Sequence, residues 1–265
     1  MKPGILFGMS FLFLVLPGKQ GFSQPGKDTP SYWTYGIANT LPEKRVELAF
    51  FTPSRIGLTN KIELSIHPLM FFLMPQVTLK IRWSSFSRFA IATQHGFSYP
   101  TQLLRLAARK GTGGFISPQF GIPQMVSVYN GILVSYGLFK QSILTVRAGI
   151  AFSIKSGSVD PASTIDLPII YPRMAVYYNN PVFDPGIDFR GNFSRLFGWL
   201  FNIQNFIVYG TGYNYFMENK GTLLYTSGKS TFQLHAGYKL CYGKYPYGNQ
   251  WQVLPVLELI FGAGR

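Results

Sequence analysis

The 265-residue chain combines 17% aromatic residues with only 13% charged residues, and its formal net charge is +14. So few charged groups would leave the surface of a soluble enzyme poorly covered, whereas an uncharged outer band and aromatic girdles are usual in a lipid-embedded barrel. The single cysteine, Cys241, excludes an intramolecular disulfide and cysteine-based metal sites. Basic charge is also typical of nucleic-acid binding, but no helix-turn-helix or zinc motif is visible, so we expect no nucleic-acid partner.

The first 23 residues have the pattern of a secretory signal peptide. Lys2 precedes the apolar run 5–16, which is followed by small residues around Phe22. About a dozen apolar residues are too few for a membrane-spanning helix, which needs ~20. We therefore predict cleavage near Ser23/Gln24 and export to the outer membrane of a Gram-negative bacterium.

Residues 24–44 are polar and Pro-rich, and they predict an irregular lead-in before a barrel domain over residues 45–265. The aromatic residues of this lead-in could pack at a barrel mouth: Tyr32, Trp33 and Tyr35.

Strands in the first part of the barrel domain are indicated by alternation of apolar with polar or small side chains. The first strand begins within 45–51, and 56–64 is expected to be a turn followed by a strand. Beyond an apolar connection at 69–75, the segments 76–83 and 86–97 alternate in the same way. Such alternation suits lipid on one face and a filled or wet lumen on the other.

The segment 99–124 interrupts this pattern. Thr101 to Lys110 places five apolar residues on one broad face between Pro100 and Gly111, which are start and stop signals for a short helix. Three roles for this helix are open: it plugs the lumen, it lies along the membrane interface, or it fills a long loop.

The second half of the chain is predicted to add strands of two kinds. Regular alternation marks 125–138 and 142–155, which are joined by a short turn at 139–141. Weaker patterns indicate further strands, at 168–178, 187–200, about 203–215 and 222–226.

The clearest strand begins at Thr231 and alternates without exception to Tyr242. Its apolar face opposes a face with Gln233, His235 and Lys239, and its length fits the roughly 9 to 11 tilted residues that cross a bilayer. A closing strand is expected at 251–261. The predicted fold class is all-β: an antiparallel transmembrane barrel of about 12 strands, with 10 or 14 also fitting, and one short helix in a loop.

Several local sequences point to a known type of barrel. They are a signal peptide that ends before Gln, IGLTNKIELSIHP (56–68), PTQLLRLAARKGTGGFISP (100–118) and GYKLCYGKYPYGNQW (237–251). With these features nearly the whole mature chain resembles uncharacterised outer-membrane β-barrel proteins of the Bacteroidota type. The resemblance implies this fold and location, with outer-membrane lipids and the barrel insertion machinery as partners. One departure is that Phe261 is followed by Gly-Ala-Gly-Arg, whereas such barrels usually end on an aromatic residue.

The polar face of the strands carries more bases than acids. If polar positions face inward, the bases are Arg45, Lys61, Lys80, Arg82, Arg88, Arg147, Lys155 and Lys239, and the acids are Glu47, Glu63 and Glu258. Charges at this depth must face water or a partner, because exposure to lipid would be costly. Two accounts are open: a packed interior in which acids pair with bases, or a water-filled bore that favours anions.

Histidines offer little sign of catalysis. Neither a nucleophile–base spacing nor a metal-ligand spacing is present, so we predict no catalytic residue, no metal site and no cofactor. We interpret four residues as a polar wall of the lumen: His67, His95, Gln233 and His235.

The sequence therefore predicts a narrow, basic-lumen pore or binding barrel for small anionic or amphipathic solutes. A structural or assembly barrel without transport and an outer-membrane lipid hydrolase are the alternatives.

Overall fold

The computed structural model describes residues 33–86, 88–111, 117–138, 142–160, 180–210, 215–229, 231–245 and 248–264. Several predicted features lie outside the described residues: the signal peptide 1–23 with its cleavage site near Ser23/Gln24, Tyr32, the turn 139–141 and the strand at 168–178.

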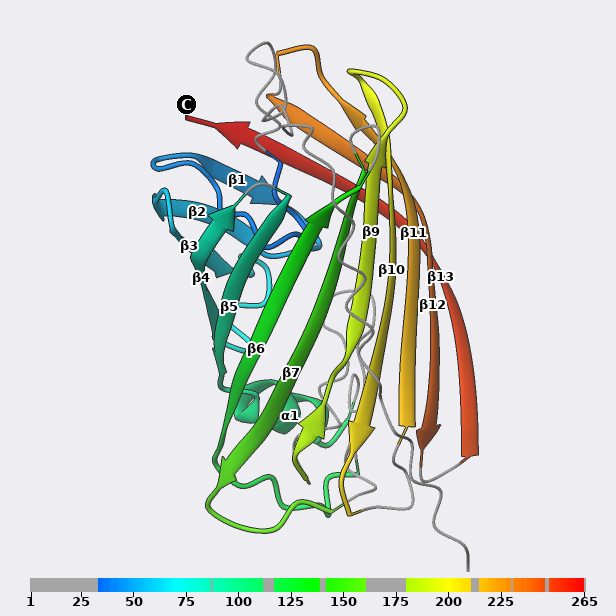
Figure 1. Cartoon of the computed structure of the whole chain (residues 1–265). Coiled ribbons are helices and arrows are strands. Elements are labelled where there is room, and N and C mark those ends of the chain that lie inside the picture. The colour runs from blue at the N-terminus through cyan, green and yellow to red at the C-terminus, as the bar shows by residue number, and fades with distance from the viewer. Residues whose placement is uncertain are drawn as a thin grey trace, which may run out of the picture.

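The described chain forms a closed antiparallel barrel with twelve strand positions, which confirms the predicted fold class (Figure 1). Its strands are β1 (Val46–Ala49), β2 (Ser54–Thr59), β3 (Ile62–Ile66), β4 (Gln76–Phe86), β5 (Phe89–Ser98), β6 (Met125–Gly137), β7 (Ile143–Lys155), β8 (Val182–Phe183), β9 (Gly186–Asn192), β10 (Phe197–Val208), β11 (Tyr215–Thr226), β12 (Phe232–Tyr245) and β13 (Gly248–Ala263). Because β8 and β9 both pair with β7 and β10, they are two pieces of one strand position. The barrel closes where β1 pairs with β13.

The two ends of the barrel differ in their connections. At the end where β13 finishes, neighbouring strands are joined by short turns, such as 60–61 between β2 and β3 and 193–196 between β9 and β10. At the opposite end several connections are longer, such as 67–75 between β3 and β4 and 99–124 between β5 and β6, although β12 ends at Tyr245 and β13 begins at Gly248. We call these the short-turn end and the long-loop end.

The wall has an apolar outer face and a polar inner face. Large apolar side chains are exposed around it, among them Ile132 on β6, Leu223 on β11 and Val253 on β13. Inward positions are buried, as Gln233 and His235 on β12 show. The parity predicted for the strand that begins at residue 231 is therefore confirmed. Exposed side chains of this kind around a whole barrel are what a lipid environment requires.

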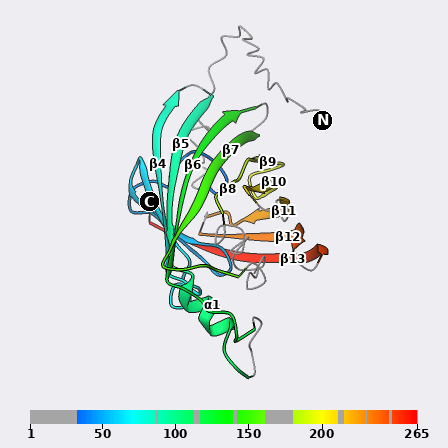
Figure 2. The same ribbon diagram turned by 90° about the horizontal axis from the view of Figure 1, so that it is seen from below.

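The helix α1 (Thr101–Ala107) is shorter than predicted, since it ends three residues before Lys110. Leu103 and Leu104 pack in an apolar cluster with Met70, Met74 and Met125. In the view from below, α1 lies beside the barrel and not within its outline (Figure 2). Among the described residues, no helix is long and apolar enough to cross a membrane.

Two strand boundaries differ from the prediction because short polar side chains bind nearby peptide groups. Residues 56–59 belong to β2 and not to a turn, and the chain reverses at 60–61, where the Thr59 hydroxyl accepts hydrogen bonds from two backbone N–H groups. The single strand expected at 187–200 is broken at 193–196, where the Ser194 hydroxyl accepts hydrogen bonds from the N–H groups of Leu196 and Phe197. Such local hydrogen bonds compete with a continuous ladder.

Candidate functional site

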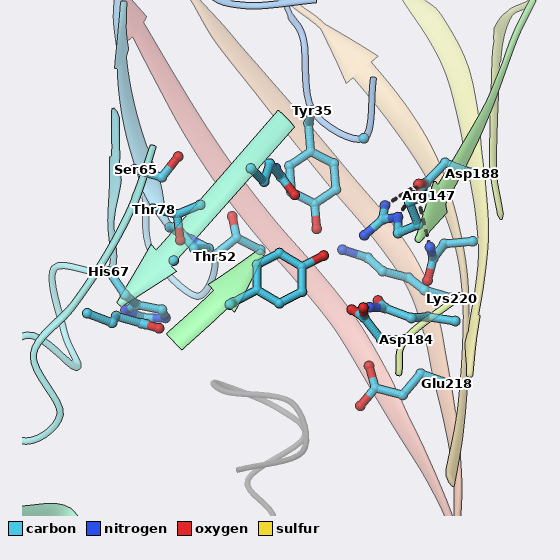
Figure 3. Close-up of a pocket in the computed structure, with 18 of the residues that line it drawn as sticks. Tyr35, Thr52, Ser65, His67, Thr78, Arg147, Asp184, Asp188, Glu218 and Lys220 are labelled. Carbon is cyan, nitrogen blue, oxygen red and sulfur yellow. Dashed lines mark hydrogen bonds and ion pairs between the residues drawn. The ribbon is translucent and has the colours of Figure 1, made fainter. Parts of the chain in front are cut away.

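The lumen contains a cavity of about 700 Å³. Its lining comes from most strands of the barrel and from the segment before β1, as the close-up shows (Figure 3). Its volume is within the range of pockets that hold one small molecule, about 300–1,000 Å³. We call this space the lumen cavity.

A stretch of the lead-in, Trp33–Leu41, closes the lumen cavity toward the short-turn end. Trp33, Ala38 and Leu41 are buried, and Tyr35 projects into the cavity (Figure 3). The segment has no regular secondary structure of its own. We call it the roof segment.

Lumen side chains hold the roof segment by its backbone. Arg190 on β9 donates hydrogen bonds to the carbonyls of Trp33 and Tyr35 at 3.0 and 3.3 Å. Ser135 on β6 accepts one from the Ala38 N–H at 2.7 Å. Peptide groups buried away from water need such partners, so these contacts fix the roof segment in place.

Glu63 on β3 joins the roof segment to one wall of the barrel. Its carboxylate accepts hydrogen bonds from the Leu41 N–H at 2.9 Å and from the Thr34 hydroxyl at 3.2 Å. The same carboxylate lies 3.1 Å from the Lys80 ammonium and 3.7 Å from the Arg55 guanidinium. Arg55 also forms a close ion pair with Glu47. These charges are thus engaged in the packed interior.

The opposite wall carries a second group of charges, on β7 to β10. Arg147 donates from Nε to Asp188 at 2.8 Å, and Asn202 donates to the other oxygen of the same carboxylate at 2.8 Å. Asp184, between β8 and β9, accepts from Gln204 at 2.9 Å. Its Oδ1 atom is buried and has no hydrogen-bond partner among the described residues.

Two ammonium groups face each other on β11 and β12, where Lys220 is the cross-strand partner of Lys239. Lys239 forms an ion pair with Glu218 at 3.0 Å. Lys220 lies 5.2 Å from the centre of the Tyr35 ring, and no carboxylate in the described part of the chain is within ion-pair distance of it. Like charges directly opposite each other are unfavourable, so an anionic group near Lys220 would relieve this pair.

The structure brings five of the eleven predicted lumen charges together around the cavity. These are Glu63, Lys80, Arg147, Lys239 and Glu258, and the predicted polar residue His67 also lines it. The other six charges lie elsewhere. Arg45 and Glu47 are buried at the short-turn end, where Glu47 forms an ion pair with Arg55. Lys61 is exposed in the turn between β2 and β3, Arg82 donates to the Asn60 carbonyl near the short-turn end, Arg88 is in the turn between β4 and β5, and Lys155 is at the long-loop end of β7.

The other three residues predicted for the polar wall do not line the lumen cavity. His95 faces outward on β5, where it hydrogen-bonds Asn130 at 2.8 Å, because it shares the parity of the apolar residues of that strand. His235 and Gln233 do face inward and contact each other at 2.7 Å, but neither lines the lumen cavity. Within the described residues, no serine hydroxyl or carboxylate hydrogen-bonds a histidine ring.

The expected surplus of bases does not occur in the lumen cavity. Its lining contains five basic residues and five acidic ones, which are Arg55, Lys80, Arg147, Lys220 and Lys239 against Glu63, Asp184, Asp188, Glu218 and Glu258. Sequence reasoning omitted three of these acids and two of these bases. Weak apolar alternation marks the strands that carry Asp188, Glu218 and Lys220. Asp184 lies between β8 and β9, and Arg55 precedes the segment that was interpreted as a turn.

Comparison with known proteins gives matches to solved structures only. No protein-family model matches the sequence, and no curated protein matches it. OccAB4 of Acinetobacter baumannii is 11% identical with a TM-score of 0.41, over 80% of this chain and 52% of that one, so the chain spans about half of its length. A bacterial polysaccharide outer-membrane secretin is 10% identical with a TM-score of 0.42, over 82% and 68% of the two chains. The outer-membrane channel DcaP of Acinetobacter baumannii is 10% identical with a TM-score of 0.40, over 87% and 65%.

Proposed function

We propose that this protein is an outer-membrane barrel that binds small amphipathic solutes in its lumen. The observation that carries this proposal is the lumen cavity, because it joins charged groups of both signs to apolar surface. Lys220 and Asp184 supply polar contacts, while Leu200, Phe206 and Val182 supply apolar ones. Pockets with a mainly apolar lining and a few placed polar groups are typical small-molecule sites.

The outer face supports a location in a membrane. Strands of 10 to 16 residues, from β4 to β7 and from β10 to β13, are long enough to cross a bilayer when tilted. In barrels of this type short turns face the periplasm and long loops face outward. The roof segment would then close the periplasmic side, and α1 would lie outside the cell.

Binding in a closed lumen is better supported than an open, anion-selective bore. The roof segment occupies one end of the lumen, and the bases of the cavity are matched in number by acids. Lys80 and Arg147, which could have selected anions, form ion pairs with Glu63 and Asp188. The intact protein should therefore conduct ions poorly and retain solutes in the cavity.

A cavity-filling substitution tests this proposal. Ala151 is buried on β7 and lines the lumen cavity, whereas Ala148 of the same strand points outward. We expect Ala151→Trp to weaken the binding of dansylglycine, a small amphipathic probe, by at least tenfold in nanodiscs. The matched variant Ala148→Trp should bind the probe as the wild type does.

Fluorescence titration of the two variants and the wild type measures this difference. Heat-modifiable migration on a gel shows that each barrel is assembled. Equal affinity of the two variants would place the probe outside the cavity and contradict the proposal. No binding by the wild type would favour a structural barrel without transport.

A further inference from the structure

The strand β13 extends far beyond its neighbour β1. The two strands pair only from Ile260 to Ala263, opposite Ala49 to Val46. The rest of β13, Gly248–Leu259, continues toward the long-loop end with β12 on one side (Figure 1). Along this length the other edge of β13 has no strand partner among the described residues.

A proline at position 255 agrees with an unpaired edge. The Gly262 N–H donates to the Thr231 carbonyl beside β12, so even-numbered residues of β13 direct their peptide groups toward β12. In a regular antiparallel strand the odd-numbered residues then direct their peptide N–H and C=O groups away from β12, toward the open edge. Pro255 is one of these, and its missing N–H costs no hydrogen bond if that edge is open, which is where proline is tolerated in sheets.

The lumen cavity reaches this edge. Alternation would allow only inward residues of β13 to line it, yet the outward residues Pro255 and Leu257 line it as well. So does Phe97, an outward residue near the long-loop end of β5. Leu257 and Phe97 are 65% and 49% exposed, so these two residues border both the cavity and the exterior. The barrel wall is therefore open between the unpaired part of β13 and the long-loop end of the paired strands β4 and β5, below the short strands β1 to β3.

The upper border of this opening is the corner between β1 and β2. Glu258 accepts hydrogen bonds from the N–H groups of Phe50 and Phe51 at 2.7 and 3.0 Å. The Phe51 carbonyl contacts Nε2 of His67 at 2.9 Å. The corner thus presents the Phe51 side chain and the next residues, 52 and 53, to the cavity. We call the gap bounded by Phe51, Pro53, Phe97, Pro255 and Leu257 the side opening.

The far wall of the cavity offers contacts for a head group that carries both charges. The Lys220 ammonium has no carboxylate partner among the described residues, and the buried Asp184 Oδ1 atom has no hydrogen-bond partner among them either. Both side chains lie on the same side of the cavity (Figure 3). A phosphate beside Lys220 and an ammonium beside Asp184 would satisfy these groups.

We propose that the side opening admits a single-chain zwitterionic lipid from the bilayer into the lumen cavity. The acyl chain enters between Phe51 and Leu257, and the head group binds the wall that carries Lys220 and Asp184. A cavity of about 700 Å³ has the size of pockets for one small molecule, which suits one chain and not a two-chain phospholipid. This inference rests on the proposed solute-binding function and names the class of solute and its route.

The route is tested by obstructing the side opening. Val256 points inward at this edge and lines the cavity, whereas Val253 of the same strand is 70% exposed on the outer face. Nanodiscs that contain 1-palmitoyl-lysophosphatidylethanolamine are loaded with wild type, Val256→Trp or Val253→Trp, and native mass spectrometry measures the bound lipid. We expect Val256→Trp to retain at least tenfold less lipid than the other two. Heat-modifiable migration on a gel shows that each variant is assembled.

The outcomes separate the route from the proposed function. Equal lipid retention by Val256→Trp and Val253→Trp would overturn the side route. A wild type that binds dansylglycine but retains no lysophospholipid would overturn the lipid assignment and leave solute binding intact. If Val256→Trp does not assemble, Thr52→Trp obstructs the same opening from the corner and must give the same loss.

Discussion

Arg190 donates a hydrogen bond from its guanidinium to the carbonyl oxygen of Trp33 at 3.0 Å, although 157 positions separate the two residues in the chain. The contact joins the lead-in to the wall of β9 and makes the roof segment part of the barrel interior. A base that could have attracted anions instead binds peptide oxygens. The lumen charge therefore serves the architecture of the closed end.

Loss of this contact should loosen the roof segment. Arg190→Met keeps a long side chain but removes the donors to Trp33 and Tyr35. We expect planar-bilayer conductance to rise several-fold above that of the wild type, because the closed end then opens more often. The exposed Arg195 in the turn after β9 provides the control, and Arg195→Met should conduct like the wild type. Unchanged conductance of Arg190→Met would mean that the other contacts suffice to hold the roof.

The ion selectivity of the opened barrel should be weak. Five acids and five bases line the cavity, so their fields largely cancel. Reversal potentials of Arg190→Met across a salt gradient should be near zero. Adding Lys220→Glu should shift them toward cation preference, whereas adding Arg82→Glu, outside the cavity, should shift them much less. A strong anion preference of Arg190→Met, measured before Lys220→Glu is added, would instead support a bore that favours anions.

Removing the charge of Glu63 should destabilise the barrel more than removing an exposed acid. Glu63→Gln would leave Lys80 without a close carboxylate, whereas Arg55 would keep Glu47, and breaking a buried ion pair costs about 3–5 kcal/mol. The control Glu43→Gln lies in the exposed part of the lead-in and should change the unfolding free energy little. Urea unfolding in lipid vesicles measures both.

A double variant distinguishes the charge from the packing in this pair. Glu63→Gln with Lys80→Met removes both charges, so part of the lost stability should return. If the two effects simply add, then the ion pair does not couple these residues, and Glu63 acts through its hydrogen bonds to the roof segment.

An added charge should impair assembly when it lies on the outer face of the barrel but not when it lies in the lumen. Leu223→Arg on β11 would direct a guanidinium into lipid, at a cost of ~2–4 kcal/mol near the midplane. Lys220→Arg on the same strand keeps a cation in the lumen and should assemble normally. Folding yield into vesicles measures the difference, and equal yields would argue against a lipid-facing surface.

Gln233→Arg, which sequence reasoning would consider harmless because residue 233 points inward, is now expected to be damaging. Gln233 is only 1% exposed and hydrogen-bonds Thr226 and His235. Alternation identifies the inner face of a strand, but it does not show how tightly that face is packed.

Alternation is a local signal, and this explains which parts of the structure the sequence predicts. Long strands such as β7 and β12 alternate over a dozen residues, so the local pattern decides both their existence and their faces. The region of Asp184 and Asp188 is divided by Pro185 and has no such pattern. The roof segment is held only by partners far away in the chain, such as Arg190 and Ser135, so its place in the lumen has no local signal.

The seam between β1 and β13 has a consequence for the order of assembly. It joins residues 46–49 to residues 260–263, so the ring cannot be completed until the last strand, β13, has been synthesised. Contacts of such large sequence separation form slowly. The roof segment directly precedes β1 and must already lie inside when this seam forms. The final step of folding would then enclose the earliest part of the described chain.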